Sequence, residues 1–447
     1  METAGQLVGR SLDGLSRDYS TARTVPEHVD APPVRQSLSR RTSADLEIVV
    51  GISRDAITYV GARDYRPKWA TGSISSRDAY FIFEIVTRER PQHVAELGVS
   101  AGTSTTFLAS LLADRVSGSR LSAFDERDHV YYEPTKPVGA AILDIFGSVP
   151  AHVTIHPNVR GDQVAAIVAP GERFDLLFLD ANHIHPWPCL DILSVLDVLR
   201  PNSWIMLHDV RLPIMHPEKQ HYGPLFLYQT WPGQKARPEG ENTNIAAIRL
   251  FDSIQENTSA LLGCLDIPWH ANPSGEAWAA ARRSLERRDA HASIILKRLL
   301  DRPRVAKQLK LSDCEFVVGG PARGLKLPLD FAQHPLVLTI GDPSEPPTSI
   351  EFTNMSPSDC NGIILSEILA SGVLAGNLNV TLSIAGEDGA TIAQRVTNIE
   401  GGRPGFALLL VPLEYRRPFK IEVSVSGNEL VCDSHGSAVT FNSILLV

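Results

Sequence analysis

Four acidic residues, Glu96, Asp125, Asp180 and Asp209, stand at the ends of short apolar stretches that have the composition of buried strands. The carboxyl ends of parallel strands meet at one edge of a sheet, so we expect these side chains to share the crevice where ligands bind. Carboxylates there can accept hydrogen bonds from amines and hydroxyls or bind a divalent cation. His183, three residues after Asp180, adds a group that takes up a proton near neutral pH.

The first of these acids precedes a loop that contains two glycines. Residues 93–97 predict a buried strand, residues 98–104 form the loop with Gly98, Ser100, Gly102 and Thr103, and residues 105–113 have an apolar helical pattern. Glycine lets the backbone approach a ligand closely, and small hydroxyl residues supply donors near the helix N-terminus. The pattern Glu-x-Gly-x-x-x-Gly differs from the dinucleotide fingerprint Gly-x-Gly-x-x-Gly.

A second strand–helix–strand passage follows the same plan. Residues 173–180 and 204–209 are buried strands that end in Asp180 and Asp209, and residues 190–199 form the helix between them. Together with a strand at 120–125 and another at 153–157, this predicts an α/β fold with a doubly wound, Rossmann-like sheet. Residues 243–250 are expected to form its last strand.

Taken in order, the motifs between residues 91 and 210 resemble those of class I S-adenosylmethionine (SAM)-dependent methyltransferases. They are most similar to the subgroup that methylates hydroxyls of sugars and small molecules, the methyltransferase domain 24 type. The residues that carry this resemblance are Glu96, Gly98, Gly102, Phe174, Asp175, Asp180, His183, Leu199, Pro201, His208 and Asp209.

The resemblance implies a set of cofactor contacts and an O-methyltransferase activity. Glu96 would hold the methionine end of SAM, and Asp125 the ribose hydroxyls. Gly98, Ser100, Gly102, Thr103 and Asp180 would complete the cofactor site. The loop after the strand at 153–157, residues 158–162, is the candidate for adenine contacts, and the acceptor would be a sugar or glycan hydroxyl.

The chemistry of an alcohol acceptor predicts the catalytic groups. Because a hydroxyl is a very weak acid, we expect His183 to remove its proton, with Asp180 beside it. A divalent metal such as Mg²⁺, bound by Asp180, Asp209 and His208, would stabilise the developing alkoxide. Metal dependence stays open, because Val210 stands where related metal-binding sequences often have a second carboxylate. The metal site is then either incomplete or completed by His208 or Asn182. Alternatively, the two aspartates orient loops or bind the cofactor, and His183 acts without a metal.

Composition limits the remaining possibilities. The chain has 447 residues, a net charge of −9 and five scattered cysteines without a Cys-x-x-Cys pair. These features predict several domains, no nucleic-acid partner, neither a disulfide framework nor a zinc site, and a cytoplasmic location. No apolar run is long enough for a membrane span. The sequence leaves homo-oligomer formation open.

The pattern divides the chain into four parts: a disordered tail (1–45), the methyltransferase domain (46–252), a helical connector (253–311) and a β-sandwich-like accessory domain (312–447). Within the long segment after Asp209, Tyr222, Tyr228 and Trp231 are candidate acceptor contacts or core residues. The accessory domain is expected to bind a glycan or to serve in docking, oligomerisation or support.

Two other functions compete with the methyltransferase. A nicotinamide-dependent oxidoreductase would share the strand, loop and acid, but the glycine spacing does not fit. Alternatively, the chain is a glycan-binding or scaffold protein with an inactive methyltransferase-like domain. The presence of all four strand-end acids favours an active enzyme.

Overall fold

The computed structural model describes two ranges of the chain. The first is residues 47–287, apart from 73, 217–220, 240–242, 268, 270, 272 and 274. In the second, it describes residues 316–319, 336–340, 348–355, 360, 362–371, 373–399, 405–411, 415, 417–432 and 437–446. The predicted tail and the connector beyond residue 287 lie outside the described residues. No described helix combines the length and the apolar character needed to cross a membrane.

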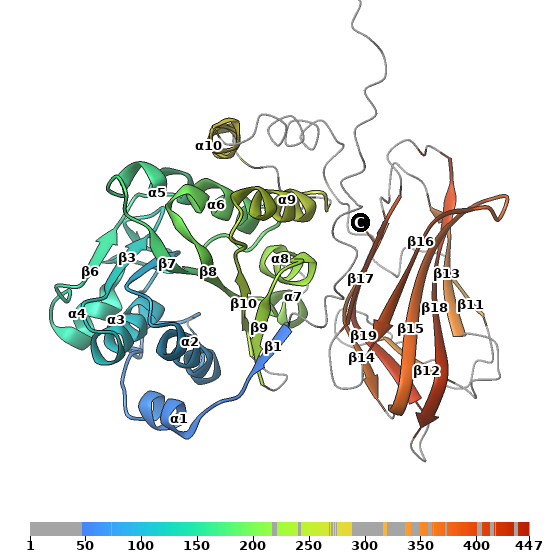
Figure 1. Ribbon diagram of the computed structural model, residues 1–447, viewed down its shortest axis with the longest axis horizontal. Coiled ribbons are helices and arrows are strands. Elements are labelled where there is room, and N and C mark those ends of the chain that lie inside the picture. Colours follow the sequence, from blue (N-terminus) through green and yellow to red (C-terminus); the bar gives the residue numbers. More distant parts are fainter. Residues whose placement is uncertain are drawn as a thin grey trace, which may run out of the picture. The chain divides into compact units, whose positions relative to one another are not determined.

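The first part is an α/β fold built on one eight-stranded sheet (Figure 1). Its strands are β1 (Glu47–Val50), β2 (His93–Leu97), β3 (Arg120–Phe124), β6 (Val153–His156), β7 (Phe174–Leu179), β8 (Leu199–His208), β9 (Lys235–Pro238) and β10 (Ile245–Arg249). Its order is β1-β9-β10-β8-β7-β2-β3-β6. The central strands β8, β7, β2, β3 and β6 are parallel, and β10 is antiparallel to β8 and β9. The predicted doubly wound sheet is confirmed.

Helices cover both faces of this sheet. They are α1 (Arg54–Gly61), α2 (Ser76–Glu89), α3 (Thr103–Arg115), α4 (Ala140–Phe146), α5 (Gly161–Ile167), α6 (Trp187–Val195), α7 (Leu212–Met215), α8 (Gly223–Thr230), α9 (Ile254–Leu265) and α10 (Gly275–Glu286), with the hairpin β4 (His129–Val130) and β5 (Glu133–Pro137) after β3. Alternate residues of β7 enter two cores: Leu176 and Phe178 pack with α1, α2 and α3, and Leu177 and Leu179 with α6, α8 and α9. Being buried on both faces, β7 is apolar almost throughout, as a central parallel strand must be.

The segment predicted as a helical connector is partly integrated into this fold. Leu261 and Leu265 of α9 and Leu285 of α10 belong to the same apolar cluster as β7 and α6. Ser284 Oγ also donates to the Leu193 carbonyl of α6 at 3.0 Å. The described part of the segment therefore extends the α/β unit past residue 252, because its apolar faces complete that core.

The second part consists of antiparallel β-sheets, as predicted in outline. One sheet has the order β11-β13-β18-β15-β16 and the other β12-β19-β14-β17. The strands are β11 (Phe316–Gly319), β12 (Leu336–Ile340), β13 (Thr348–Met355), β14 (Gly362–Ser371), β15 (Val373–Gly386), β16 (Thr391–Ile399), β17 (Gly405–Leu410), β18 (Phe419–Cys432) and β19 (Ser437–Leu446). Side chains of both sheets, such as Val380 of β15 and Leu365 of β14, share one apolar cluster.

Candidate active site

The order of the sheet reverses between β2 and β7. From β2 the chain continues to β3 and β6 on one side, and from β7 to β8 on the other. Loops after neighbouring strands therefore diverge at this point and leave room for a ligand. The loop after β2 carries the glycines, and the loop after β7 carries Asp180 and His183.

Both loop glycines have positive φ angles and touch other backbone segments. Gly98 has φ of 89°, and a Cβ there would collide with the Asp180 carbonyl. Gly102 has φ of 84°, and a Cβ would lie 2.8 Å from the Cα of Gly139. These glycines thus let the loop after β2 pack closely against neighbouring backbone. The sequence had instead suggested that they allow close approach of a ligand.

Glu96 lies fully buried under this loop. Its Oε1 accepts a hydrogen bond from Ser104 Oγ in the first turn of α3. Its Oε2 has no hydrogen-bond partner among the described residues. Burial raises the pKa of the Glu96 carboxyl to about 8, although the Ser104 hydroxyl opposes this shift. A buried carboxylate oxygen that lacks a donor fits an amino group supplied by a ligand.

Two other predicted residues belong to the same loop and to the helix after it. Ser100 has φ of 47°, and its buried Oγ has no hydrogen-bond partner in the described part of the chain. Thr103 is the first residue of α3 and is 3% exposed. A non-glycine residue in the left-handed conformation is a form of backbone strain that is often found at binding sites.

Asp125, directly after β3, fixes the glycine loop. Its Oδ2 accepts the backbone N–H groups of Val99 at 2.9 Å and Ser100 at 2.8 Å, and its Oδ1 accepts that of Arg127 at 2.9 Å. The carboxylate therefore joins the ends of β2 and β3. A carboxylate can accept further bonds beyond these three. Contact with a ribose stays a prediction.

Asp180, His183 and Asp209 form a cluster at the ends of β7 and β8. His183 Nε2 lies 3.1 Å from Asp180 Oδ1 and 3.3 Å from Asp209 Oδ2. One ligand atom from each of the three residues lies within 4.8 Å of the others, as a bound metal ion would require. Although burial opposes protonation, the two carboxylates raise the pKa of His183.

His208, predicted as a metal ligand, has a different place. Its Nδ1 lies 3.0 Å from Asp180 Oδ1, and its Nε2 lies 3.7 Å from Asp78 Oδ2. Burial disfavours the charged imidazole, but the carboxylates on both sides raise the pKa of His208 well above its ordinary value. Among the described residues, His208 is also outside the group of three whose ligand atoms lie within 4.8 Å of one another. This geometry therefore favours His208 as a donor to Asp180 and His183 as the third member of the cluster.

Two supporting residues escaped the sequence analysis. Asp78 in the first turn of α2 is 2% exposed and accepts Ser75 N–H at 2.8 Å and Asn244 N–H at 3.0 Å. The Asn244 side-chain amide in turn donates to Asp209. Asp209 itself has φ of 60°, so this network holds it in a left-handed conformation. The Ser75-x-x-Asp78 capping box was visible in the sequence, but its proximity to His208 was not.

The aromatic candidates of the segment after β8 lie in the core. Tyr222, Tyr228 and Trp231 are 2%, 6% and 1% exposed. They cannot form an acceptor wall in this state, because their rings are covered by the apolar cluster of the sheet. Tyr131 of the β4–β5 hairpin is instead 59% exposed. Partial burial raises the pKa of Tyr131, and Tyr132 and the charges of Asp180 and Asp209 add to this shift.

The predicted adenine loop follows β6. Asn158 donates its N–H to the Arg127 carbonyl at 3.2 Å, and Arg160 binds Asp162 at 3.0 and 3.1 Å. Gly161 begins α5 and lies against Asp191 of α6. Burial raises the pKa of Asp191 to about 7. These polar residues follow β6, the strand that pairs with β3. Their contact with adenine stays a prediction.

A model of the methyltransferase domain family matches residues 95–210. This stretch begins in β2 and ends just after Asp209, so it includes the glycine loop and the acidic cluster. Residues 95–210 are a class I methyltransferase domain. The chain is thus a SAM-dependent methyltransferase in this part, and the orphaned Glu96 oxygen fits the amino group of that cofactor.

Solved structures with low sequence identity resemble part of the chain. The O-methyltransferase TomG from Streptomyces achromogenes, involved in tomaymycin synthesis and solved with SAM, is 16% identical, with a TM-score of 0.32 over 44% of this chain and 86% of TomG. An O-methyltransferase from Bacillus cereus, solved with S-adenosylhomocysteine (SAH), is 14% identical, with a TM-score of 0.32 over 44% of this chain and 89% of its own. No curated protein matches the sequence. We transfer no substrate and no residue role from these relatives.

Proposed function

We propose that this methyltransferase transfers the methyl group of SAM to a hydroxyl oxygen, and that the acceptor is a sugar or another small hydroxylated molecule. The cluster of Asp180, His183 and Asp209 beside the glycine loop carries this proposal. An amine acceptor with a free lone pair needs no such group of acids, whereas a hydroxyl must lose its proton as the new bond forms.

The reaction assigns a task to each group of the cluster. The hydroxyl oxygen attacks the sulfonium methyl, the carbon–sulfur bond breaks, and SAH leaves with the electron pair. The hydroxyl proton passes to His183 Nδ1, because Nε2 faces the Asp180 and Asp209 carboxylates and donates to them, which orients the ring. The carboxylates stabilise the imidazolium that forms, in the same way that they raise its pKa before the reaction.

The same three residues fit a divalent cation. Two carboxylates and an imidazole suit Mn²⁺, Fe²⁺ or Zn²⁺ at least as well as Mg²⁺, which prefers oxygen ligands. Such an ion would supply positive charge that stabilises the developing alkoxide. In a metal-bound enzyme, His183 would be a ligand, and the acidity of the hydroxyl would come from the ion. Asn182 and His208 are then neighbours of the site without being needed as ligands.

The cofactor site in this proposal consists of the residues at the ends of β2 and β3. Glu96 binds the amino group, Asp125 binds the ribose, and the loop of Gly98, Ser100, Gly102 and Thr103 surrounds the methionine part. Asp180 lies where the two sites meet, because its backbone touches Gly98 and its carboxylate touches His183. This arrangement would put the methyl group near the acceptor.

Tyr131 is our candidate for contact with the acceptor. It is the exposed aromatic ring on the hairpin that begins after β3, and the end of that hairpin is bonded to the glycine loop through Gly139 N–H and the Ser100 carbonyl at 2.9 Å. An exposed ring can stack on the apolar face of a sugar or on an aromatic acceptor. Glycan binding by the β-rich part stays a prediction of its own.

Replacement of His183 tests the proposal. SAH release from SAM is measured with a panel of sugars and phenols, for the wild type and for His183→Ala. We expect turnover to fall by about 10²–10⁴-fold with cofactor affinity largely kept. His152→Ala is the matched control, because His152 precedes β6, at the amino ends of the parallel strands, where its Nε2 lies 3.0 Å from the Ala109 carbonyl oxygen. Full turnover in His183→Ala would remove His183 from the mechanism.

A further inference from the structure

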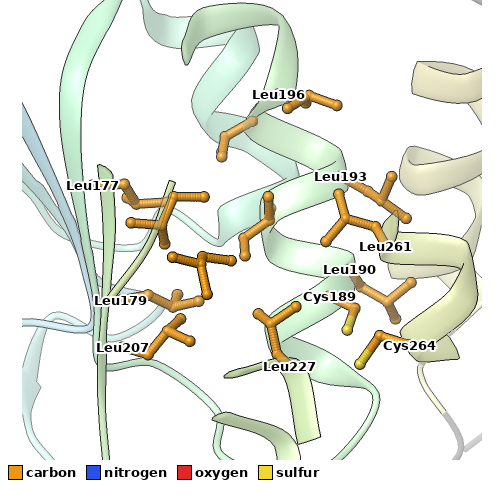
Figure 2. Close-up of a cluster of buried hydrophobic side chains, with 14 of the residues drawn as sticks. Leu177, Leu179, Cys189, Leu190, Leu193, Leu196, Leu207, Leu227, Leu261 and Cys264 are labelled. Atoms are coloured by element: carbon orange, nitrogen blue, oxygen red, sulfur yellow. The ribbon is translucent and has the colours of Figure 1, made fainter. Parts of the chain in front are cut away.

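A second cluster of metal-binding side chains lies in the core behind the acidic cluster. His185 comes from the loop after β7, Cys189 from α6 and Cys264 from α9. One ligand atom from each lies within 4.8 Å of the others, and the three side chains are at most 1% exposed. Figure 2 shows the sulfur atoms of Cys189 and Cys264 on facing sides of the two helices, among leucines.

The orientation of His185 suits a ligand. Its Nε2 lies 3.2 Å from the Ile267 carbonyl oxygen. Because a carbonyl can only accept, Nε2 carries the proton and Nδ1 carries the lone pair. A hydrogen bond from the other ring nitrogen to a backbone carbonyl is the usual way in which proteins orient a metal-binding imidazole.

We propose that His185, Cys189 and Cys264 bind one Zn²⁺ ion that stabilises the fold. Two thiolates and a neutral imidazole are ligands that Zn²⁺ prefers. Their two negative charges also balance the charge of the ion, so the complex is neutral in an apolar core where a net charge would be costly. Cu⁺ with the same ligands would leave one negative charge buried among leucines.

The position of the site gives the ion a structural role. His185 lies two residues after His183, in the loop that follows the acidic cluster. Zinc would tie this loop to α6 and α9, in addition to the hydrogen bond from Gly223 N–H to the His183 carbonyl at 2.8 Å. The sequence did not predict a zinc site, because Cys264 is far along the chain from His185 and Cys189. Only the packing of α9 on α6 brings Cys264 close to them.

Two other states of these residues compete with zinc. Cys189 and Cys264 are free thiols in the structure, and buried free cysteines often serve only as small apolar residues. Under oxidising conditions, two neighbouring thiols can instead form a disulfide by losing two electrons and two protons to an oxidant such as oxygen. Both alternatives are outcomes of the test.

The experiment measures metal bound by the full-length protein purified under reducing conditions. Zinc content is determined by mass spectrometry before and after treatment with a thiol-blocking mercurial, and Co²⁺ is then added to the metal-free protein. We expect zinc that the mercurial releases, and a sulfur-to-cobalt charge-transfer band in the near ultraviolet. Oxygen and nitrogen ligands of the acidic cluster cannot give that band.

Variants assign the ion to the site. Cys189→Ala and Cys264→Ala should lose the cobalt band. Cys360→Ala should keep it, because Cys360 is an equally buried cysteine that lies in the β-rich part. Asp180→Asn should also keep it, which separates this site from the acidic cluster.

Three results would overturn the proposal. The first is reduced wild-type protein that releases no zinc to the mercurial and shows no cobalt band. The second is a cobalt band that persists in Cys264→Ala, and the third is a Cys189–Cys264 disulfide in zinc-free protein. If the cysteine variants do not fold, the wild-type zinc content and cobalt spectrum decide alone.

Discussion

The α/β part and the β-rich part of this protein bury different kinds of side chains. In the α/β part, Glu96, Asp78 and His208 are buried with hydrogen-bond or ion-pair partners. Among the described residues of the β-rich part, every buried side chain is apolar. Buried polar groups cost stability unless they are paired, so their concentration in one part indicates where the chemistry takes place.

The backbone shows the same difference. The non-glycine residues with positive φ, Arg90, Ser100, Asn158, Asn202 and Asp209, all belong to the α/β part of the described chain. Ser100 belongs to the loop after β2, and Asp209 directly follows β8. A β-sheet region with an apolar core needs only regular pairing, whereas a site needs side chains in positions that regular structure does not supply.

Asp180→Ala should have the largest effect on methyl transfer. It leaves His183 and His208 side by side without the carboxylate between them, so we expect kcat to fall by about 10²–10⁴-fold. Steady-state kinetics with SAH release checks this result. Asp114→Asn, which alters an ion pair with Arg63 elsewhere in the α/β part, should leave kcat unchanged. Equal losses in both variants would contradict a specific role.

Gly98→Ala should come second. The new methyl group collides with the Asp180 carbonyl, so both SAH affinity and folding stability should fall. Gly118→Ala is the matched control, since Gly118 has φ of 78° but open space around its Cα. It should cost only about 1–2 kcal/mol of left-handed strain. SAH affinity is measured by calorimetry and stability by thermal unfolding, for both variants. If the two variants lose equally, left-handed strain alone explains the loss, and the collision with Asp180 contributes nothing.

Glu96 should make the stability of the cofactor-free protein depend on pH. Its pKa is about 8 in the fold against 4.5 as a free side chain, so the folded state keeps a proton that the unfolded chain loses. The free energy of unfolding should therefore decrease as pH rises from about 4.5 to about 8, by up to about 1.4 kcal/mol per unit. Denaturant titrations of the wild type and Glu96→Gln test this. A slope that persists in the variant must have another source.

Tyr131→Ala should have a smaller effect, confined to the acceptor. Loss of this exposed ring should raise the acceptor KM by about tenfold or less while the KM for SAM stays the same. Phe146→Ala, at an exposed ring of α4, is the control. A change in the KM for SAM would place Tyr131 at the cofactor instead.

Leu382→Ala should leave methyl transfer unchanged. Leu382 is fully buried in the β-rich part, so the cavity should cost about 2–5 kcal/mol of stability. Thermal unfolding and kcat are measured on the same sample below the transition. A lower kcat in this still-folded variant would show that the β-rich part takes part in the reaction.

The sequence predicted the elements whose signal is local. Apolar strands, the acids at their ends and the glycine loop are each written in a few consecutive residues, and β2, β3, β7 and β8 agree with them. Exposure was not predictable in the same way. Tyr222 and Tyr131 are both tyrosines in irregular-looking segments, and only packing decides that the first is buried and the second is not.

Residues that reach the site through tertiary contacts were also missed. Asp78 and Asn244 lie far apart along the chain and meet only because β10 pairs with β8 and α2 packs beside them. The helices α9 and α10 were predicted as a connector because amphipathic helices look alike whether they cover a core or link two domains.

The central claim is that the carboxyl end of β2 binds SAM through Glu96. The most direct measurement is a calorimetric titration with SAH of the wild type, Glu96→Gln and Leu382→Ala. We predict saturable binding to one site in the wild type and in Leu382→Ala, and affinity at least about tenfold weaker in Glu96→Gln, a difference of about 1.4 kcal/mol. Absence of binding to the wild type, or equal affinity in Glu96→Gln, would contradict the account.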